Sequence, residues 1–266
     1  MVLNKKNITT FAHGKDNEPP KKQPKIMIII PNKDPMGTAI ADFHRQGKAA
    51  HLRVFSPDFD EDEIPVATLF RSFDEMPPLE QQALQMAHGR ILDVGAGAGC
   101  HSLCLQEMEK NVTAIDISPL SVETMTSRGV HDARLKDFWS VEERYDTILM
   151  LMNGIGIVGK LNELPRFFDH LQQLLSDGGQ LLLDSSDICY LFEDEEEGII
   201  ELPGGAYYGE LEYQMQYKAI KGDAFPWLYI DFETLAEAAD AHGFTAEMIQ
   251  MGSHYDYLAR LVKKAK

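Results

Sequence analysis

The stretch Ile91-Leu-Asp-Val-Gly-Ala-Gly-Ala-Gly-Cys100 decides how the rest of this 266-residue chain is interpreted. Its first half is a short apolar run of the kind that forms a buried strand. Its second half is three glycines that alternate with alanines, and helical spacing begins at His101. Glycine adopts positive φ easily and lets a ligand approach the backbone. The stretch therefore predicts a strand, a tight turn and a helix start that together bind a ligand.

Two details of this stretch distinguish a nicotinamide dinucleotide from S-adenosylmethionine (SAM) as the ligand. In the dinucleotide fingerprint the third glycine comes three residues after the second, whereas here that position is Cys100 and the third glycine is Gly99. Asp93 also places a carboxylate at the end of the strand. A carboxylate repels a pyrophosphate and attracts the sulfonium and ammonium groups of SAM. Both details favour SAM.

A second acidic residue supports the same ligand. Residues 112–116 are the next strand-like run, which ends at Asp116. An acid about 20 residues after the first glycine is placed to accept hydrogen bonds from ribose hydroxyls. Because Asp93, Asp116 and the glycines come from the ends of adjacent strands, they predict a single cofactor site.

The series Asp93-x-Gly95-x-Gly97-x-Gly99 resembles motif I of the class I SAM-dependent methyltransferases, and the similarity extends over roughly residues 89–263. The resemblance implies an α/β fold with a Rossmann-like, doubly wound, seven-stranded and mostly parallel sheet. The last strand, about Tyr255 to Val262, would be antiparallel. The resemblance also implies methyl transfer with SAM as the cofactor.

The same resemblance implies which residues bind the cofactor. Ile117 would pack on the adenine, Asp137 would accept from the adenine amino group, and Phe138 would lie beside the ring. The full predicted set is Asp93, Gly95, Ala96, Gly97, Gly99, His101, Asp116, Ile117, Asp137, Phe138, Met152 and Asn153.

The residues predicted to be catalytic are Asn153, Asp187 and Tyr190, which follow the fourth and fifth expected strands. Families that methylate adenine or amide nitrogen carry two prolines after the residue at the Asn153 position, and this chain has Gly-Ile-Gly there, which argues against those substrates. A structural interpretation remains open for two of the three. Asn153 would be a turn residue before glycine. The carboxylates and hydroxyls of the run Asp184-Ser-Ser-Asp187 would either bind a polar or cationic acceptor or take its proton, or they would cap a helix.

Short strands and helices alternate from residue 77 onward, which is typical of a parallel sheet with helical crossovers. We therefore assign residues 77–266 to the methyltransferase domain. The alternation breaks within 185–230, where residues 209–220 alternate polar and apolar side chains and 225–230 follow a turn. This pattern predicts an inserted antiparallel hairpin that forms a lid over the substrate.

The first 76 residues divide into two parts. Residues 1–25 have no hydrophobic period and predict a disordered tail. Residues 26–76 predict an N-terminal cap or lid, with strands at 26–30 and 52–56 and a helix that begins at Asp34-Pro35 and ends at Gly47.

Phe70 and Phe73 flank Arg71 near the end of this cap. Two interpretations of the segment are equally supported. It is either a lid over the cofactor or substrate, or an aromatic pair that packs the N-terminal helix.

Composition restricts the partners. The formal net charge is −17, although six lysines fall within the first 26 residues, so nucleic acid is a disfavoured partner. No apolar run approaches the roughly 20 residues that a membrane span needs. The three cysteines cannot all pair, and no signal peptide is recognised, so we expect a cytoplasmic protein.

Cys100, His101 and Cys104 are residue types that bind zinc. A structural zinc site needs four ligands, normally in two spaced pairs, and the sequence shows no second pair. We therefore predict no metal, and we expect the two cysteines to pack against the sheet.

The sequence thus predicts a SAM-dependent methyltransferase that acts on a small molecule. Three alternatives stay open at this point: a methyltransferase that acts on a protein or RNA, a non-catalytic SAM-binding protein, and a dinucleotide-dependent oxidoreductase. The sequence predicts neither the acceptor atom nor the oligomeric state.

Overall fold

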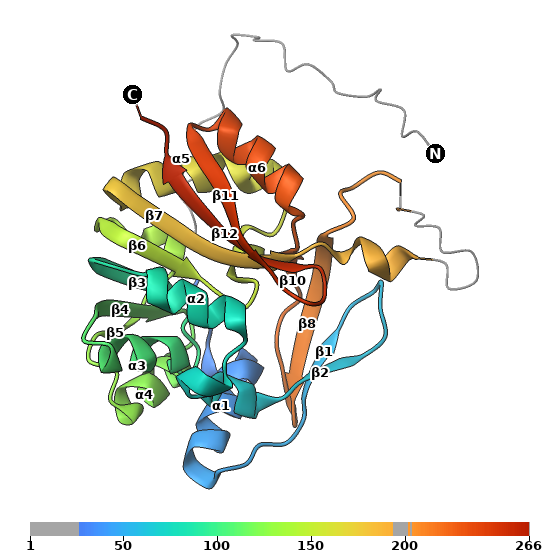
Figure 1. Cartoon of the computed structure of the whole chain (residues 1–266). Helices are drawn as coiled ribbons and strands as arrows, with labels where there is room; N and C mark the ends of the chain where they lie inside the picture. Colours follow the sequence, from blue (N-terminus) through green and yellow to red (C-terminus); the bar gives the residue numbers. More distant parts are fainter. Residues whose placement is uncertain (1–26, 194–201, 203, 266) are drawn as a thin grey trace.

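The structure, a computed structural model, describes residues 27–193, 202 and 204–265. The tail predicted at residues 1–25 lies outside this part of the chain. Within it, two sheets lie side by side, and helices cover the larger sheet (Figure 1).

The larger sheet has seven strands in the order β11-β12-β7-β6-β3-β4-β5. β12 is antiparallel to both of its neighbours, and the pairs from β7 to β5 are parallel. This confirms the Rossmann-like sheet with an antiparallel last strand. The strands are β3 (Arg90–Val94), β4 (Asn111–Asp116), β5 (Ala133–Leu135), β6 (Tyr145–Met150), β7 (Leu175–Ser186), β11 (Phe244–Met251) and β12 (Asp256–Lys263).

Helices bury both faces of this sheet because neighbouring residues of its central strands point to opposite sides. Leu149 and Leu182 pack with α2 and α3, whereas Ile148 and Leu181 pack with α5 and α6. Buried apolar side chains on both faces explain why the central strands are continuous apolar runs in the sequence. The helices are α2 (Pro78–Met86), α3 (Cys100–Glu107), α4 (Pro119–Arg128), α5 (Leu164–Leu174) and α6 (Phe232–Ala241).

The second sheet joins the cap to the insertion. β8 lies between β1 and β10, and all of these pairs are antiparallel, so the predicted hairpin is present. Its partner β1 comes from the cap and was not expected beside it (Figure 1). The strands are β1 (Leu52–Phe55), β2 (Asp62–Ile64), β8 (Glu210–Tyr217), β9 (Ile220–Lys221) and β10 (Phe225–Leu228).

The cap helix forms as predicted. α1 (Pro35–Gln46) begins after Asp34, whose side chain accepts a hydrogen bond from Gly37 N, and it ends at Gly47 with φ of 67°. Phe70 packs on Phe43 of this helix, with ring centroids 4.6 Å apart. Its ring therefore has the packing role that was one of the two interpretations of that segment.

The strand predicted at residues 26–30 is wrong for the four of these residues that the structure describes, 27–30. Two amides tie the segment to other described residues: Met27 N donates to Asp137 Oδ2, and Ile29 N donates to Ile117 O. Two isolated hydrogen bonds do not form the ladder of a β-sheet. The apolar run therefore stays irregular, because no strand edge lies beside it in the described part of the chain.

Short 3₁₀ helices connect the larger elements, seven of them among the residues that the structure describes. They are η1 (Pro31–Lys33), η2 (Val66–Phe70), η3 (Phe73–Glu75), η4 (Phe138–Ser140), η5 (Gly154–Val158), η6 (Leu161–Glu163) and η7 (Ile188–Phe192). No helix in the described part of the chain is both long and apolar enough to cross a membrane. The domain boundaries at residues 26, 77 and 185 stay predictions.

Candidate active site

The glycine turn after β3 leaves its backbone open at one position. Gly95, Gly97 and Gly99 have φ values of 68°, 57° and 81°. A Cβ built on Gly95 would meet no atom within 4 Å, whereas a Cβ on Gly99 would lie 2.9 Å from Met125 Cγ and from Val130 Cγ2. Gly95 therefore faces free space that a ligand can enter, and Gly99 is required for packing.

We expect Gly99→Ala and Gly95→Ala to differ in what they damage. Both place a side chain at positive φ, which costs about 1–2 kcal/mol. Gly99→Ala also pushes against Met125 and Val130, so urea denaturation should show a free energy of unfolding about 2 kcal/mol lower than for Gly95→Ala. Calorimetric titration with S-adenosylhomocysteine should show the larger loss of affinity in Gly95→Ala. Equal losses of stability would contradict this division.

Asp116 holds the turn at the end of β4. Its Oδ2 accepts from Gly97 N and its Oδ1 from Ser118 N, each at 2.8 Å. Burial raises the pKa of Asp116 to about 6. The side chain is still partly exposed, so it presents a carboxylate beside the open turn.

The predicted adenine residues are already in contact with other parts of the chain. The carboxylate of Asp137 accepts from Trp139 N at 3.0 Å and from Met27 N at 2.9 Å. Only 3% of Phe138 is exposed, and its ring lies 6.0 Å from that of Phe167 in the core. Segment 27–30 thus runs past the place where the adenine was expected, and the adenine contacts of Asp137, Phe138 and Ile117 stay predictions.

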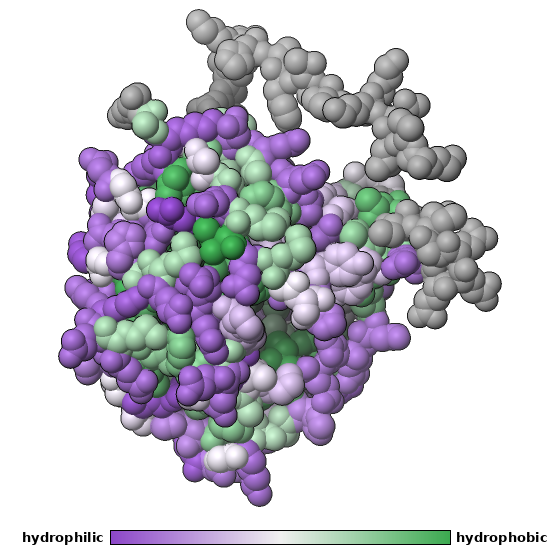
Figure 2. Space-filling model, viewed as in Figure 1, coloured by the Kyte–Doolittle hydropathy of each residue, from purple (hydrophilic) through white to green (hydrophobic). Residues whose placement is uncertain are grey.

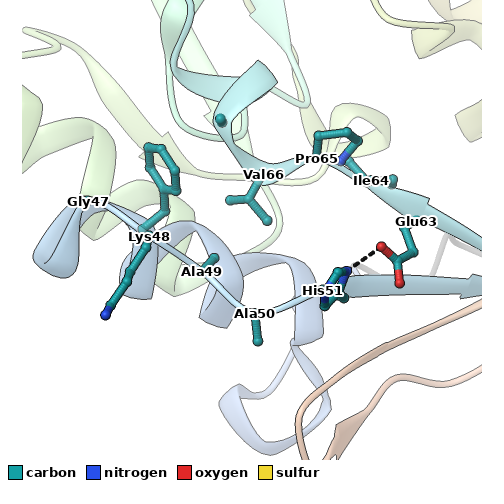
Figure 3. Close-up of a pocket in the computed structure, with 11 residues that line it drawn as sticks. Gly47, Lys48, Ala49, Ala50, His51, Glu63, Ile64, Pro65 and Val66 are labelled. Carbon is teal, nitrogen blue, oxygen red and sulfur yellow. Dashed lines mark hydrogen bonds and ion pairs between the residues drawn. The ribbon is translucent and has the colours of Figure 1, made fainter.

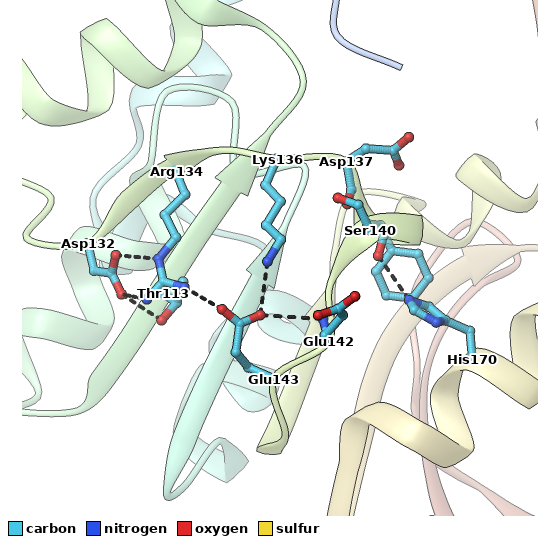
Figure 4. Close-up of polar contacts among 10 residues, drawn as sticks. Thr113, Asp132, Arg134, Lys136, Asp137, Ser140, Glu142, Glu143 and His170 are labelled. Carbon is cyan, nitrogen blue, oxygen red and sulfur yellow. Dashed lines mark hydrogen bonds and ion pairs between the residues drawn. The ribbon is translucent and has the colours of Figure 1, made fainter. Parts of the chain in front are cut away.

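An ion-pair network steadies the strand that leads to Asp137 (Figure 4). Asp132 accepts from Thr113 and Arg134, and Glu143 accepts from Arg134 and Lys136 at 3.1 and 2.9 Å. These contacts join β4, β5 and the loop before β6. They fix Lys136, and with it the neighbouring Asp137, at the edge of the sheet.

A buried charged cluster lies under the other end of the turn. Nη2 of Arg71 donates to both oxygens of Glu80 at 2.8 Å, and Glu80 Oε2 is 2.7 Å from His101 Nε2. Burial alone would lower the pKa of His101, but Glu80 and Asp93 raise it on balance. Asp93 accepts from Ser102 and is 2% exposed, so it lies beneath the turn and burial raises its pKa.

One buried donor of Arg71 lacks a partner among the described residues. Among the buried side-chain nitrogens and oxygens of the described residues, only Nε of Arg71 makes no hydrogen bond. A buried donor without an acceptor is costly. Its Nη2 also lies 3.7 Å from Met152 Sδ, at the end of β6. The rest of the guanidinium is partly exposed, so Arg71 is a candidate for binding an anionic group, although the sequence interpretation treated the segment only as a lid or a packing element.

Asn153 lies at the end of β6 in a strained turn. Met152 and Asn153 have φ values of 59° and 56°, a region that non-glycine residues rarely adopt. Asn153 N donates to Asp184 Oδ1 at 2.7 Å, its Nδ2 to Leu228 O at 3.2 Å, and its Oδ1 accepts from Ser185 Oγ at 2.8 Å. These bonds tie β6, β7 and the end of β10 together. The side chain thus has the structural role of a turn residue, and its role in turnover stays a prediction.

The other two residues predicted to be catalytic lie at η7. Asp187 Oδ1 accepts from Tyr208 Oη at 2.7 Å and from Cys189 N at 2.9 Å, so it caps η7 as the structural interpretation held. Tyr190 is 39% exposed and stacks on Tyr255 with centroids 5.2 Å apart. Their catalytic roles also stay predictions.

The described residues were also compared with two other kinds of site, a surface cavity and a metal centre. A cavity of about 430 Å³ lies between the end of α1 and the β2–η2 segment and contains none of the predicted site residues (Figure 3). No group of three His, Cys, Asp or Glu side chains in the described part of the chain lies where it would hold a metal ion.

Comparisons with known proteins agree with this geometry. A family model described as "Methyltransferase domain" matches residues 46–248. A SAM-dependent methyltransferase from Bacteroides fragilis, solved in complex with S-adenosylhomocysteine, is 57% identical; the match covers 90% of this chain and 99% of that one, with a TM-score of 0.85. A comparison with curated proteins found no match.

More distant structures share the fold. The CcbJ methyltransferase from Streptomyces caelestis is 15% identical, with 87% of this chain and 98% of that one covered and a TM-score of 0.57. A protein from Pyrococcus horikoshii OT3 is 18% identical, with 70% and 88% covered and a TM-score of 0.52.

The chain belongs to the family of class I SAM-dependent methyltransferases. Its cofactor is SAM, and the alternative of a dinucleotide-dependent oxidoreductase is wrong. The open backbone at Gly95, beside the carboxylate of Asp116, leaves room for a nucleoside.

Proposed function

We propose that this methyltransferase acts on a small-molecule acceptor. The observation that supports this most is the way the second sheet covers the carboxyl edge of the main sheet. The ring of Trp227 on β10 lies where a Cβ of Gly156 would be, 2.1 Å from its position, so β10 packs directly on η5. Figure 2 shows a hollow near the middle of the molecule, with hydrophobic residues inside it, between the places of α2 and β8 in Figure 1. A covered site of this kind favours a small acceptor over a folded protein or RNA.

In this proposal, different residues bind different parts of the cofactor. Asp116 binds the ribose hydroxyls, and Asp137 and Ile117 bind the adenine. Backbone groups at Gly95 and Gly97 approach the nucleoside, and Arg71 binds the methionyl carboxylate through the exposed part of its guanidinium beside Met152. Asp93, His101, Ala96, Gly99 and Met152 support these groups from the turn and from the end of β6.

When bound, SAM supplies a methyl group on an activated sulfonium. The chain therefore has to align the acceptor with that group and exclude water, and good alignment contributes roughly 7–11 kcal/mol. Asn153 positions the ends of β6 and β7 for this purpose, and Asp187 and Tyr190 contact the acceptor. The two buried thiols, Cys100 and Cys104, are compatible with a reducing compartment, and we propose a cytoplasmic location.

The acceptor class is tested with radiolabelled SAM. The protein is incubated with a small-molecule extract and, in parallel, with protein and RNA fractions of the same cells. We expect label only in the small-molecule fraction. Label in protein or RNA would overturn the proposal, and binding of SAM without transfer to any fraction would favour a non-catalytic SAM-binding protein.

The pKa of Asp116 predicts how nucleoside binding depends on pH. The pKa is raised to about 6, and only the ionised carboxylate has lone pairs free for both ribose hydroxyls. Affinity should therefore increase with pH through this value, by about tenfold between pH 5 and pH 7. Calorimetric titration with 5′-methylthioadenosine, which has no amino-acid portion, measures this directly. Asp116→Asn should show no such dependence, and an unchanged profile in that variant would assign the titration to another group.

A further inference from the structure

We propose that the acceptor is an amine that binds as its ammonium form, and that Asp184 receives its proton before methyl transfer. This inference rests on the proposed function, since it concerns the acceptor side of the same site. It starts from the position of Asp184, which belongs to the run 184–187 that the sequence assigns either to the acceptor or to a helix cap.

Asp184 lies where the cofactor side and the acceptor side meet. Its Oδ1 accepts from Asn153 N at 2.7 Å, and the neighbouring Met152 has its Sδ 3.7 Å from Arg71 Nη2. In the other direction, Asn153 Nδ2 donates to Leu228 O, directly before Tyr229. These contacts place one carboxylate between the group that binds the methionyl end and the wall of the second sheet.

This carboxylate still has acceptor capacity. Asp184 Oδ1 accepts from Asn153 N, and a backbone hydrogen bond from Met152 also acts to lower the pKa of Asp184. An ionised carboxylate has about four lone-pair sites, so it can accept from one more donor. Asp184 is partly exposed although it follows the buried strand residues 181–183. A positively charged donor that enters from the acceptor side can therefore reach it.

Tyrosine side chains from the second sheet and η7 lie on the acceptor side of Asp184. The rings of Tyr213 and Tyr229 lie 6.5 Å apart and nearly perpendicular, and the charges of Tyr190, Asp62 and Asp184 all act on Tyr229. Aromatic faces and carboxylates attract an ammonium group and offer little to an anion.

The charged groups around Asp184 come from several elements. Glu80 on α2 and His101 on α3 act on its pKa in opposite directions, and Tyr229 and Tyr257 face it from the insertion and from β12. Burial is the largest cause, and it raises the pKa of Asp184 to about 6. The group is thus ionised at neutral pH yet basic enough to share in proton transfer.

The reaction balances with the groups at hand. The ammonium R–NH₃⁺ gives one proton to the Asp184 carboxylate and becomes R–NH₂. The nitrogen lone pair then forms a bond to the methyl carbon while the carbon–sulfur bond breaks, and its electron pair stays on sulfur. The products are R–NH₂⁺–CH₃ and S-adenosylhomocysteine, and no other reactant is needed.

The test compares benzylamine with benzyl alcohol, which differ only in the polar group. Each is titrated calorimetrically into the protein saturated with S-adenosylhomocysteine. We expect the amine to bind at least tenfold more tightly, and its affinity to increase about tenfold from pH 5 to pH 7 as Asp184 ionises. Asp184→Asn should remove both effects and still bind S-adenosylhomocysteine within a few-fold of the unaltered protein.

The matched control is Asp177→Asn, which removes the same charge from an exposed position at the other end of β7. It should leave both titrations unchanged. Equal or absent binding of the two probes overturns the amine proposal, and so does an Asp184→Asn variant that loses S-adenosylhomocysteine. Failure of the unaltered protein to bind S-adenosylhomocysteine would instead overturn the proposed function itself.

Discussion

Replacing Arg71 by methionine is expected to weaken the binding of S-adenosylhomocysteine by about a hundredfold and to leave the binding of 5′-methylthioadenosine unchanged. The guanidinium of Arg71 is partly exposed beside Met152, and only the first of these ligands has a carboxylate to accept from it. Hydrogen bonds to charged groups contribute about 1.5–3 kcal/mol each, and 1.4 kcal/mol corresponds to a factor of ten. Calorimetric titration of both ligands measures the difference.

Two checks accompany the Arg71 prediction. Retained binding of 5′-methylthioadenosine shows that the glycine turn is intact even though Glu80 has lost one of its two partners. Arg45→Met, at an exposed position on α1, should leave both affinities unchanged. If both ligands weaken equally in Arg71→Met, the side chain supports the fold of the site and does not bind the carboxylate.

Replacing Asp116 by alanine should have a still larger effect and should act on both ligands alike. The carboxylate is expected to accept from two ribose hydroxyls, and it also accepts from Gly97 N and Ser118 N, which shapes the turn. Losing two charge-assisted hydrogen bonds lowers affinity by about a thousandfold. Equilibrium dialysis with radiolabelled SAM reaches such weak binding.

The control for Asp116→Ala is Asp74→Ala, an exposed carboxylate in η3. It should bind SAM normally. Circular dichroism should show the same secondary structure in both variants, because Asp116 is at the rim of the main sheet. Intact SAM affinity in Asp116→Ala would remove the ribose assignment, and with it the main support for the cofactor residues proposed here.

The main sheet could be predicted because its signals are local. Each central strand is a compact apolar run, and the spacing of Gly95, Gly97 and Gly99 is set by the turn they form. The sequence interpretation named no strand at the position of β11, also for a local reason. This strand follows Gly243 directly, and a register shift between Met248 and Gln250 interrupts the alternation of its side chains.

The charged cluster and the second sheet depend on contacts that no local pattern contains. Arg71 and Glu80 are neighbours of His101 only after α2 and α3 have packed on the same face of the main sheet. For residues 27–30 the sequence predicted a strand that does not form. The run is strongly apolar, but no strand edge lies beside it among the described residues. Hydrophobicity alone predicts burial and extension, but a strand also needs a partner.

The second sheet has a consequence for the evolution of acceptor specificity. Its central strand, β8, pairs with β1, and the contact from Tyr217 to Ala50 joins residues 167 positions apart. A related enzyme that received only the insertion by recombination would lack the matching edge, because register across a half-buried pair is specified by both strands. New specificities in this lineage should therefore arise either by point changes within the two segments or by inheriting them together, and chimaeras that exchange them singly should misfold.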